Sequence, residues 1–246
     1  VLFGTIRVAS GAAMLAMIVM ATRGNARFLS AGRVVSVMAL SVYVFGFSLA
    51  YVMLDAGLGA LILFGMVQIT MFVGAVVRQE PIPAARWLGA ALAFGGLIFL
   101  LAPGGGTSGI WDAALMAAAG VGWGIYSLAG RGTADALGAT AANFVLAVPI
   151  AVAALAVIGG WHVTGWGVAL AVMSGAVTSG LGYALWYAVL PALGATRGAV
   201  AQLTVPPIAM AGGMVFLDET LTWRFALASV LVLGGVALSL RPVTAR

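Results

Sequence analysis

Side chains able to do chemistry are scarce in this sequence, and most of them are amides and aromatic rings set within long apolar segments. Gln68, Asn143 and Gln202 are the most informative, because an amide in hydrocarbon must find a hydrogen-bond partner or line water. Bonding between two helices, worth about 1 kcal/mol, is the alternative role for each amide. The residues that we expect to contact a bound solute are Tyr51, Gln68, Trp123, Tyr126, Asn143, Tyr183, Trp186 and Gln202.

The residue types on which most enzymes depend are missing or isolated. There is no cysteine, and the single histidine, His162, lies in a short loop between Trp161 and Trp166. No His, Asp and Glu cluster has the spacing of a metal site or a catalytic triad. The run Gly104–Gly106 follows no strand, which disfavours a phosphate-binding loop. We therefore expect no catalytic residue, no metal and no cofactor.

The composition indicates that lipid, and not water, surrounds these side chains. Of the 246 residues, 63% are hydrophobic and only 7% are charged, and the mean hydropathy is +1.17. A spanning helix needs about 20 mostly apolar residues. Continuous apolar runs, rather than alternating ones, favour helices over a barrel. The sequence predicts an all-α integral membrane bundle with nine spans, over residues 1–22, 34–54, 57–77, 85–102, 110–130, 139–158, 165–187, 194–217 and 223–240.

The basic residues are all arginines, and their positions predict the orientation of the chain. They are scattered at helix ends and form no stripe, which disfavours nucleic acid as a partner despite the net charge of +5. By the positive-inside rule the arginine-rich side is cytoplasmic, which places the C-terminus inside and suggests a cell inner (plasma) membrane. On a nine-span count the arginines of that side are Arg23, Arg27, Arg33, Arg78, Arg86, Arg131, Arg197, Arg241 and Arg246.

Arg7 is the one cation placed within a span. Two roles are open for it. Its aliphatic side chain can extend so that the guanidinium reaches the membrane interface, or the guanidinium can pair with an anionic group of a solute. No Asp or Glu lies in the middle of a span, which argues against a carboxylate relay for ion coupling in these segments.

An internal repeat links the two halves of the sequence. Residues 57–101 laid on 196–240, an offset of 139, share twelve identities, among them Glu80 with Glu219 and Gly95-Gly96 with Gly234-Gly235. Equivalent spans of the two copies are five apart in the count, the third with the eighth and the fourth with the ninth, and five is an odd number. The copies are therefore expected to cross the membrane in opposite directions. Inverted repeats are typical of secondary transporters, with the solute site near the midplane. The expected domains are a first repeat over 1–102, which lacks its first helix, and a second repeat of five helices over 110–240.

The sequence resembles the EamA type of the drug/metabolite transporter superfamily. The resemblance rests on the motif Leu217-Asp-Glu-Thr-Leu221 with Gly234-Gly235, on Glu80 with Gly95-Gly96, on Trp123-Gly-Ile-Tyr126, and on the stretch 196–210 with its Pro206-Pro207 pair. It implies two five-helix repeats and the export or exchange of amino acids and related metabolites.

The sequence is therefore consistent with three functions. The first is a transporter of small amphipathic metabolites by alternating access, whose partners are a small-molecule substrate and the lipid bilayer. The second is a lipid-linked flippase of the same fold, which a lateral opening near an arginine would favour. The third is a non-transporting membrane subunit, which a polar cavity closed on both sides would favour. The oligomeric state stays open.

Overall fold

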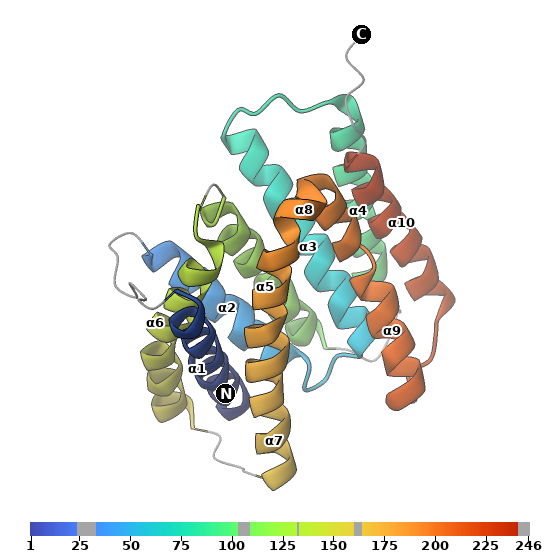
Figure 1. The fold of residues 1–246 in the computed structure, drawn as a ribbon. Helices are drawn as coiled ribbons and strands as arrows, with labels where there is room; N and C mark the ends of the chain where they lie inside the picture. The colour runs from blue at the N-terminus through green and yellow to red at the C-terminus, as the bar shows by residue number, and fades with distance from the viewer. Residues whose placement is uncertain (24–32, 103–108, 132, 160–163, 241–246) are drawn as a thin grey trace. The chain divides into compact units, whose positions relative to one another are not determined.

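All secondary structure in the described part of the chain is helical (Figure 1). This computed structural model describes residues 1–23, 33–102, 109–131, 133–159 and 164–240, with side chains at 23, 190, 191 and 193–200 left out. The helices are α1 (Leu2–Arg23), α2 (Val34–Ala50), α3 (Ala56–Val77), α4 (Ala84–Leu101), α5 (Ile110–Ala129), α6 (Ala136–Ile158), α7 (Gly165–Met173), the π-helix η1 (Ser174–Leu181), α8 (Gly182–Gln202), α9 (Val205–Phe216) and α10 (Trp223–Ser239).

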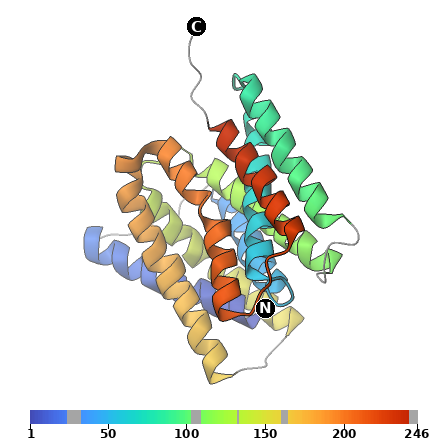
Figure 2. The ribbon, with the colours of Figure 1, turned by 90° about the vertical axis from the view of Figure 1, so that its right-hand side faces the viewer.

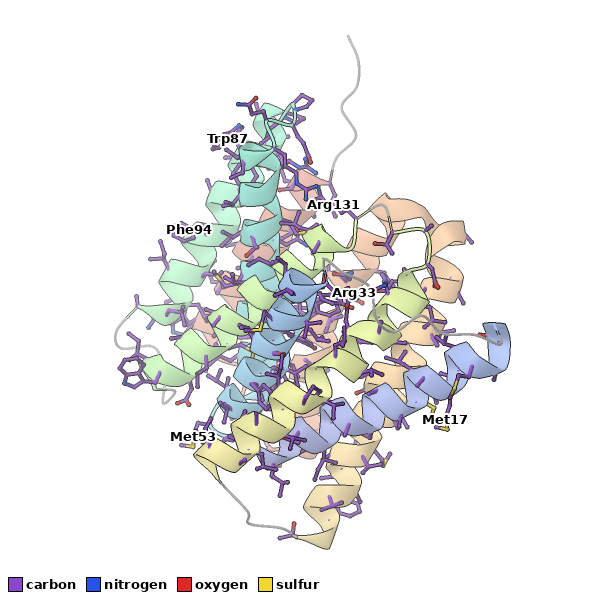
Figure 3. All side chains as sticks on the ribbon, turned by 90° about the vertical axis from the view of Figure 1, so that its left-hand side faces the viewer. Met17, Arg33, Met53, Trp87, Phe94 and Arg131 are labelled. Atoms are coloured by element: carbon purple, nitrogen blue, oxygen red, sulfur yellow. The ribbon has the colours of Figure 1, made fainter. Side chains whose placement is uncertain are left out.

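The helical membrane class predicted from composition is confirmed. Within the described residues, five helical segments are long and apolar enough to cross a membrane, and α2, α9 and α10 are shorter apolar helices. Large apolar side chains point outwards, as lipid-facing residues do; Met17, Trp87 and Phe94 are each about half exposed and project from the surface in Figure 3. Some predicted features lie outside the described residues: Arg27, Gly104–Gly106, Trp161, His162, Arg241, Arg246 and the side chains of Arg23 and Arg197.

The boundary predicted between the seventh and eighth spans is wrong. The helical path runs without interruption from α7 through η1 to Gln202, so Pro191 and Gly194 end no helix. The chain breaks instead at Leu203 and Thr204, inside the predicted span 194–217, and α9 begins there with prolines in its first turn. A proline in the first turn loses no hydrogen bond, because the N–H groups of that turn have no partner within the helix.

The helices group into two compact units. Unit 1 comprises residues 1–48 and 125–192, and unit 2 comprises 49–124 and 193–246. Each unit thus takes helices from both predicted repeats: α1 and α2 join α6, α7 and η1 in unit 1, and α3 and α4 join α9 and α10 in unit 2. A sequence repeat and a packing unit are different divisions of the chain, and the predicted repeat boundaries stay a prediction.

In unit 2, α4 and α10 lie side by side (Figure 2) and meet through glycines. A Cβ on Gly235 would lie 2.8 Å from the backbone nitrogen of Ala93, and one on Gly96 would lie 3.2 Å from that of Val232. Ala93 and Gly96 correspond to Val232 and Gly235 at the repeat offset of 139. In one contact the glycine belongs to α10 and its partner to α4, and in the other the equivalent glycine belongs to α4 and the equivalent partner to α10. A two-fold axis between the helices would produce this pair of contacts.

The same pair of helices runs antiparallel. Gly89, early in α4, lies against Ser239 at the end of α10. Arg224, at the start of α10, donates hydrogen bonds of 2.6–2.9 Å to the carbonyls of Phe99 and Ala102 at the end of α4. A cation at this position satisfies the last carbonyls of α4 and complements the negative end of its dipole.

The turns that carry Glu80 and Glu219 share a backbone feature. Each glutamate follows a residue with positive φ, Gln79 at 54° and Asp218 at 56°, and these two residues are equivalent at offset 139. Each glutamate N–H also bonds back into the end of the preceding helix, at 3.0 Å and 3.1 Å. Few residues other than glycine adopt positive φ, so the coincidence extends the repeat from sequence to backbone.

These two turns lie at opposite ends of α3. The Glu219 carboxylate accepts hydrogen bonds from the N–H groups of Ala56 (2.5 Å) and Gly57 (3.3 Å), the first residues of that helix. Glu80 follows Val77, its last residue. A helix of 22 residues is about 33 Å long, close to the thickness of a bilayer core.

Candidate functional site

Unit 1 contains a buried arginine. The Arg7 side chain on α1 is 6% exposed, so it does not reach out to an interface, which was one of the two roles open to it. Its Nη2 donates to the Tyr43 hydroxyl of α2 at 3.3 Å, and its Nε donates to the Ser179 hydroxyl of η1 at 3.4 Å. Its Nη1 has no hydrogen-bond partner among the described residues. Three helices thus converge on a guanidinium that retains one unused donor group.

Two aromatic rings make cation–π contacts with this guanidinium. Its carbon lies 4.7 Å from the ring centroid of Phe47 and 5.7 Å from that of Tyr43, both on α2. The two rings, four residues apart on one helix face, are 5.7 Å from each other. Such cation–π contacts attract a cation without neutralising its charge.

A second polar group forms around the Tyr126 hydroxyl, near the end of α5. This hydroxyl donates to Thr140 at 3.1 Å and accepts from the Asn143 amide at 3.3 Å, both on α6. Thr140 in turn donates to the Tyr187 hydroxyl of α8 at 3.3 Å. Tyr126, Thr140 and Asn143 are all buried, and the Asn143 carbonyl oxygen has no partner in the described part of the chain.

Tyr183 joins the two polar groups. Its ring stacks on Tyr187 at 6.2 Å and meets Phe144 edge to face at 5.9 Å. Its hydroxyl interacts electrostatically with Arg7, Tyr43 and Tyr126. We call the whole set the polar cluster; its members are Arg7, Tyr43, Tyr126, Thr140, Asn143, Ser179, Tyr183 and Tyr187.

The π-helix and its glycines bring η1 onto α1. A Cβ on Gly175 would collide with the Arg7 carbonyl and the Ser10 hydroxyl, and one on Gly180 would lie 2.7 Å from Cβ of Met14. Only glycine lets the two backbones approach this closely. A π-helix turns more slowly than an α-helix and often marks a functional position. Here it carries Ser179 to the Arg7 guanidinium.

The cluster does not have the composition of a metal centre. The described residues contain no group of three or more His, Cys, Asp or Glu side chains placed to hold an ion. The groups of the cluster are hydroxyls, one amide and one guanidinium. These groups can donate and accept hydrogen bonds and attract an anion.

Comparison with known proteins assigns the chain to a family. The model of the EamA-like transporter family matches residues 110–241. An uncharacterized protein of Pseudomonas aeruginosa is 45% identical over 241 residues, which cover 98% of this chain and 84% of that protein. The chain belongs to the EamA-like transporter family. A protein of known crystal structure shares 20% identity and a TM-score of 0.67 over 97% of this chain and 87% of its own, which shows a common fold.

For this EamA-like transporter, the predicted solute contacts divide between the units. Tyr126, Asn143 and Tyr183 fall in the polar cluster, and Trp186 is half-buried beside it in sequence on α8. The other four, Tyr51, Gln68, Trp123 and Gln202, belong to unit 2. The role of each as a solute contact stays a prediction.

Tyr51 has a structural role in unit 2 of this transporter. Its hydroxyl donates to the Ala56 carbonyl at 3.1 Å across the turn between α2 and α3. A Cβ on Gly59 would overlap the Tyr51 ring, so the ring packs directly on the first turn of α3. Gln68, Trp123 and Gln202 are half-buried on α3, α5 and α8.

Five members of the cluster were not among the predicted contacts: Arg7, Tyr43, Thr140, Ser179 and Tyr187. A signal was available for the tyrosines, because Tyr183 and Tyr187, like Tyr43 and Phe47, are four residues apart and so share a helix face. Thr140 and Ser179 carry no comparable signal, since small hydroxyls in helices usually bond to their own backbone.

Proposed function

We propose that this EamA-like transporter is a secondary transporter that moves small amphipathic metabolites, such as amino acids and related solutes, across the cell inner membrane. It works by alternating access, and exports or exchanges its substrate. The arginine distribution supports a cytoplasmic C-terminus. The substrate site of this proposal is the polar cluster of unit 1, to which both predicted repeats contribute helices.

The observation that carries the proposal is a pair of unsatisfied groups in this cluster. Arg7 Nη1 is a buried donor and Asn143 Oδ1 is a buried acceptor, and neither has a partner in the parts of the chain that the structure describes. An unsatisfied buried polar group costs about 1–3 kcal/mol. A solute with an acceptor group at one end and a donor group at the other would satisfy both, and would gain that energy on binding.

The alternating-access mechanism is supported by the organisation of unit 2. Glu80 and Glu219, equivalent in sequence and in backbone, lie at opposite ends of α3, and α4 runs antiparallel to its counterpart α10. Repeats threaded in opposite directions can exchange conformations, which gives inward-open and outward-open states of similar energy.

A flux experiment tests the proposal. The purified full chain is reconstituted into proteoliposomes, and the uptake of labelled amino acids and of related organic acids and amides is measured against protein-free vesicles. We expect saturable uptake of at least one solute class. No uptake of any compound in such a panel would contradict the proposed function.

A further inference from the structure

The charge of the polar cluster is not balanced within unit 1. The only acidic residue in its sequence segments, 1–48 and 125–192, is Asp135. Asp135 lies just before α6 and accepts from the Gly138 N–H at 2.8 Å. Thr5 of α1 bonds to the Ala151 carbonyl of α6 at 3.2 Å, sixteen residues and about 24 Å further along that helix. Arg7 is two residues from Thr5, so Asp135 is too far along α6 to neutralise it.

A buried charge without a counter-ion is costly, and membrane proteins retain such residues mainly for function. Hydroxyls and aromatic faces solvate the Arg7 guanidinium but supply no negative charge. Unit 1 therefore leaves the positive charge of Arg7 without a negative partner, and an anionic group of a bound solute would supply one.

We propose that Arg7 binds the carboxylate of the transported solute, and that the site prefers net-anionic organic acids to zwitterions and to neutral compounds. This inference rests on the proposed function and specifies its substrate class. It concerns the charge of the solute, which the proposed function leaves open.

The geometry supports a carboxylate at the free edge of the guanidinium. Tyr43 occupies Nη2, Ser179 occupies Nε, and the ring of Phe47 lies against the guanidinium carbon. Three fixed contacts hold the group in one orientation and leave Nη1 as the available donor. A charge-assisted bond from Nη1 to a carboxylate is about twice as strong as a neutral hydrogen bond.

Aromatic rings beside the polar groups favour an apolar remainder of the solute. The ring of Phe47 lies against the Arg7 guanidinium. The ring of Tyr183 packs edge to face on Phe144 and stacks on Tyr187. A solute with an apolar or aromatic body and a single carboxylate would suit these rings and Arg7, and a neutral donor group on it, such as a hydroxyl, could satisfy the Asn143 carbonyl oxygen. An added ammonium would meet a positive guanidinium and no carboxylate from unit 1, so a zwitterion gains less from the same site.

Matched ligands test the inference on the unaltered protein. 3-Phenylpropionate and hexanoate are compared with 3-phenylpropionamide and hexanamide, which keep the shape and lose the charge. Binding to the purified full chain in lipid nanodiscs is measured from ligand-dependent shifts of thermal unfolding. We expect each acid to bind at least about tenfold more tightly than its amide, because a charge-assisted bond replaces a neutral one. Equal binding within both pairs would overturn the inference.

Phenylalanine provides the third probe, since it differs from 3-phenylpropionate only by its ammonium group. We expect it to bind more weakly than the acid. Tighter binding of phenylalanine would show that the site takes zwitterions, which would overturn the preference for net anions while leaving the proposed function intact.

Variants assign the preference to Arg7. Arg7→Gln should bring the ratio of acid to amide affinity close to one, and Arg7→Lys should retain a weaker preference because lysine keeps the charge but not the planar donor set. Arg224→Gln is the matched control, since that guanidinium donates to the Phe99 and Ala102 carbonyls in unit 2. A wild-type ratio in Arg7→Gln would contradict the inference.

Two milder variants cover the case in which Arg7→Gln does not fold. Tyr43→Phe and Ser179→Ala each remove one bond that orients the guanidinium, and each should lower the acid preference without abolishing binding. The flux experiment distinguishes failure of this inference from failure of the proposed function. Flux that does not depend on the charge of the solute contradicts this inference alone. The absence of flux for every solute contradicts the proposed function.

Discussion

The Tyr126 hydroxyl links two other side chains of the polar cluster, because it bonds to Thr140 and to Asn143. Tyr126→Phe removes both bonds at a position that is 6% exposed. We expect the free energy of unfolding to fall by about 1–2 kcal/mol. Flux in proteoliposomes should also fall sharply at temperatures where the variant remains fully folded, because the hydroxyls of the site lose their arrangement.

Tyr51→Phe is the control for that variant. It removes one hydrogen bond, from the Tyr51 hydroxyl to the Ala56 carbonyl in a turn of unit 2. We expect a loss of stability below about 1 kcal/mol. Flux should be unchanged if the proposed polar cluster, and not the contact predicted at Tyr51 from the sequence, is the substrate site. If Tyr51→Phe abolished flux and Tyr126→Phe did not, the site would lie in unit 2 and the polar cluster would be structural.

Asp55 gives a prediction about pH. Partial burial and the neighbouring Glu219 carboxylate raise the pKa of Asp55 above its usual value of 3.8. A raised pKa means that the folded protein favours the protonated acid, so this stabilisation is present below pH 3.8 and is lost as the pH rises through the raised pKa. Asp55→Asn should therefore raise the unfolding temperature at neutral pH and leave it unchanged at low pH.

Thermal unfolding of the detergent-solubilised protein from about pH 3 to about pH 8 measures this effect. The gain from Asp55→Asn should shrink in a Glu219→Gln background, because the repulsion between the two carboxylates is then already absent. An equal gain at every pH would show that charge is not its cause.

Part of the candidate site could be predicted from single residues. Tyr126, Asn143 and Tyr183 stand out as polar or aromatic groups in apolar helices, and the structure brings them together. Arg7 stands out in the sequence as the one cation within a span, but its burial depends on Tyr43 and Ser179, which are 36 and 172 residues away. Such contacts depend on tertiary packing, which no local pattern in the sequence reveals.

At the scale of helices, the pairing of α4 with α10 depends on which glycine of each Gly-Gly pair faces the partner. Gly96 and Gly235 face it, with backbone atoms 3.2 Å or less from an added Cβ, whereas Gly95 and Gly234 have nothing within 4 Å. Gly96→Ala and Gly235→Ala should each lower the free energy of unfolding by about 1–3 kcal/mol, because overpacking forces the helices apart.

Gly95→Ala and Gly234→Ala are matched controls in the same helices. They add the same methyl group in open space and should be neutral or stabilising by up to about 1 kcal/mol. Unfolding in mixed micelles with increasing denaturing detergent measures all four variants. Equal effects at adjacent glycines would mean that α4 and α10 do not meet through this face.

Most helices begin and end within a few residues of their predicted limits, because apolar length and turn residues are local signals. The exception is the path from α7 to α9. The predicted spans 165–187 and 194–217 leave a break at 188–193 that the helix does not make, whereas the Pro206-Pro207 pair, predicted to lie inside a span, begins α9. A proline ends a helix or opens one according to its surroundings, so its presence alone does not locate the boundary.

At the scale of the whole molecule, the predicted sequence repeats and the compact packing units divide the chain at different places. Both units combine helices from the first and second halves of the sequence. The repeat can be predicted from sequence identities. The grouping of helices from both repeats into each unit cannot, because that grouping depends on which apolar helix faces pack together. A motion that exchanges the two repeats would consequently change the packing inside the units, including the helices that carry the polar cluster.

The central claim is that the two repeats cross the membrane in opposite directions. Because the sequence contains no cysteine, single cysteines at Pro81 and Thr220, which are exposed and equivalent at offset 139, can be labelled without background. A membrane-impermeant maleimide is applied to right-side-out and to inside-out vesicles that contain Pro81→Cys or Thr220→Cys. The account predicts that the two positions are labelled from opposite sides of the membrane; labelling of both from the same side would contradict it.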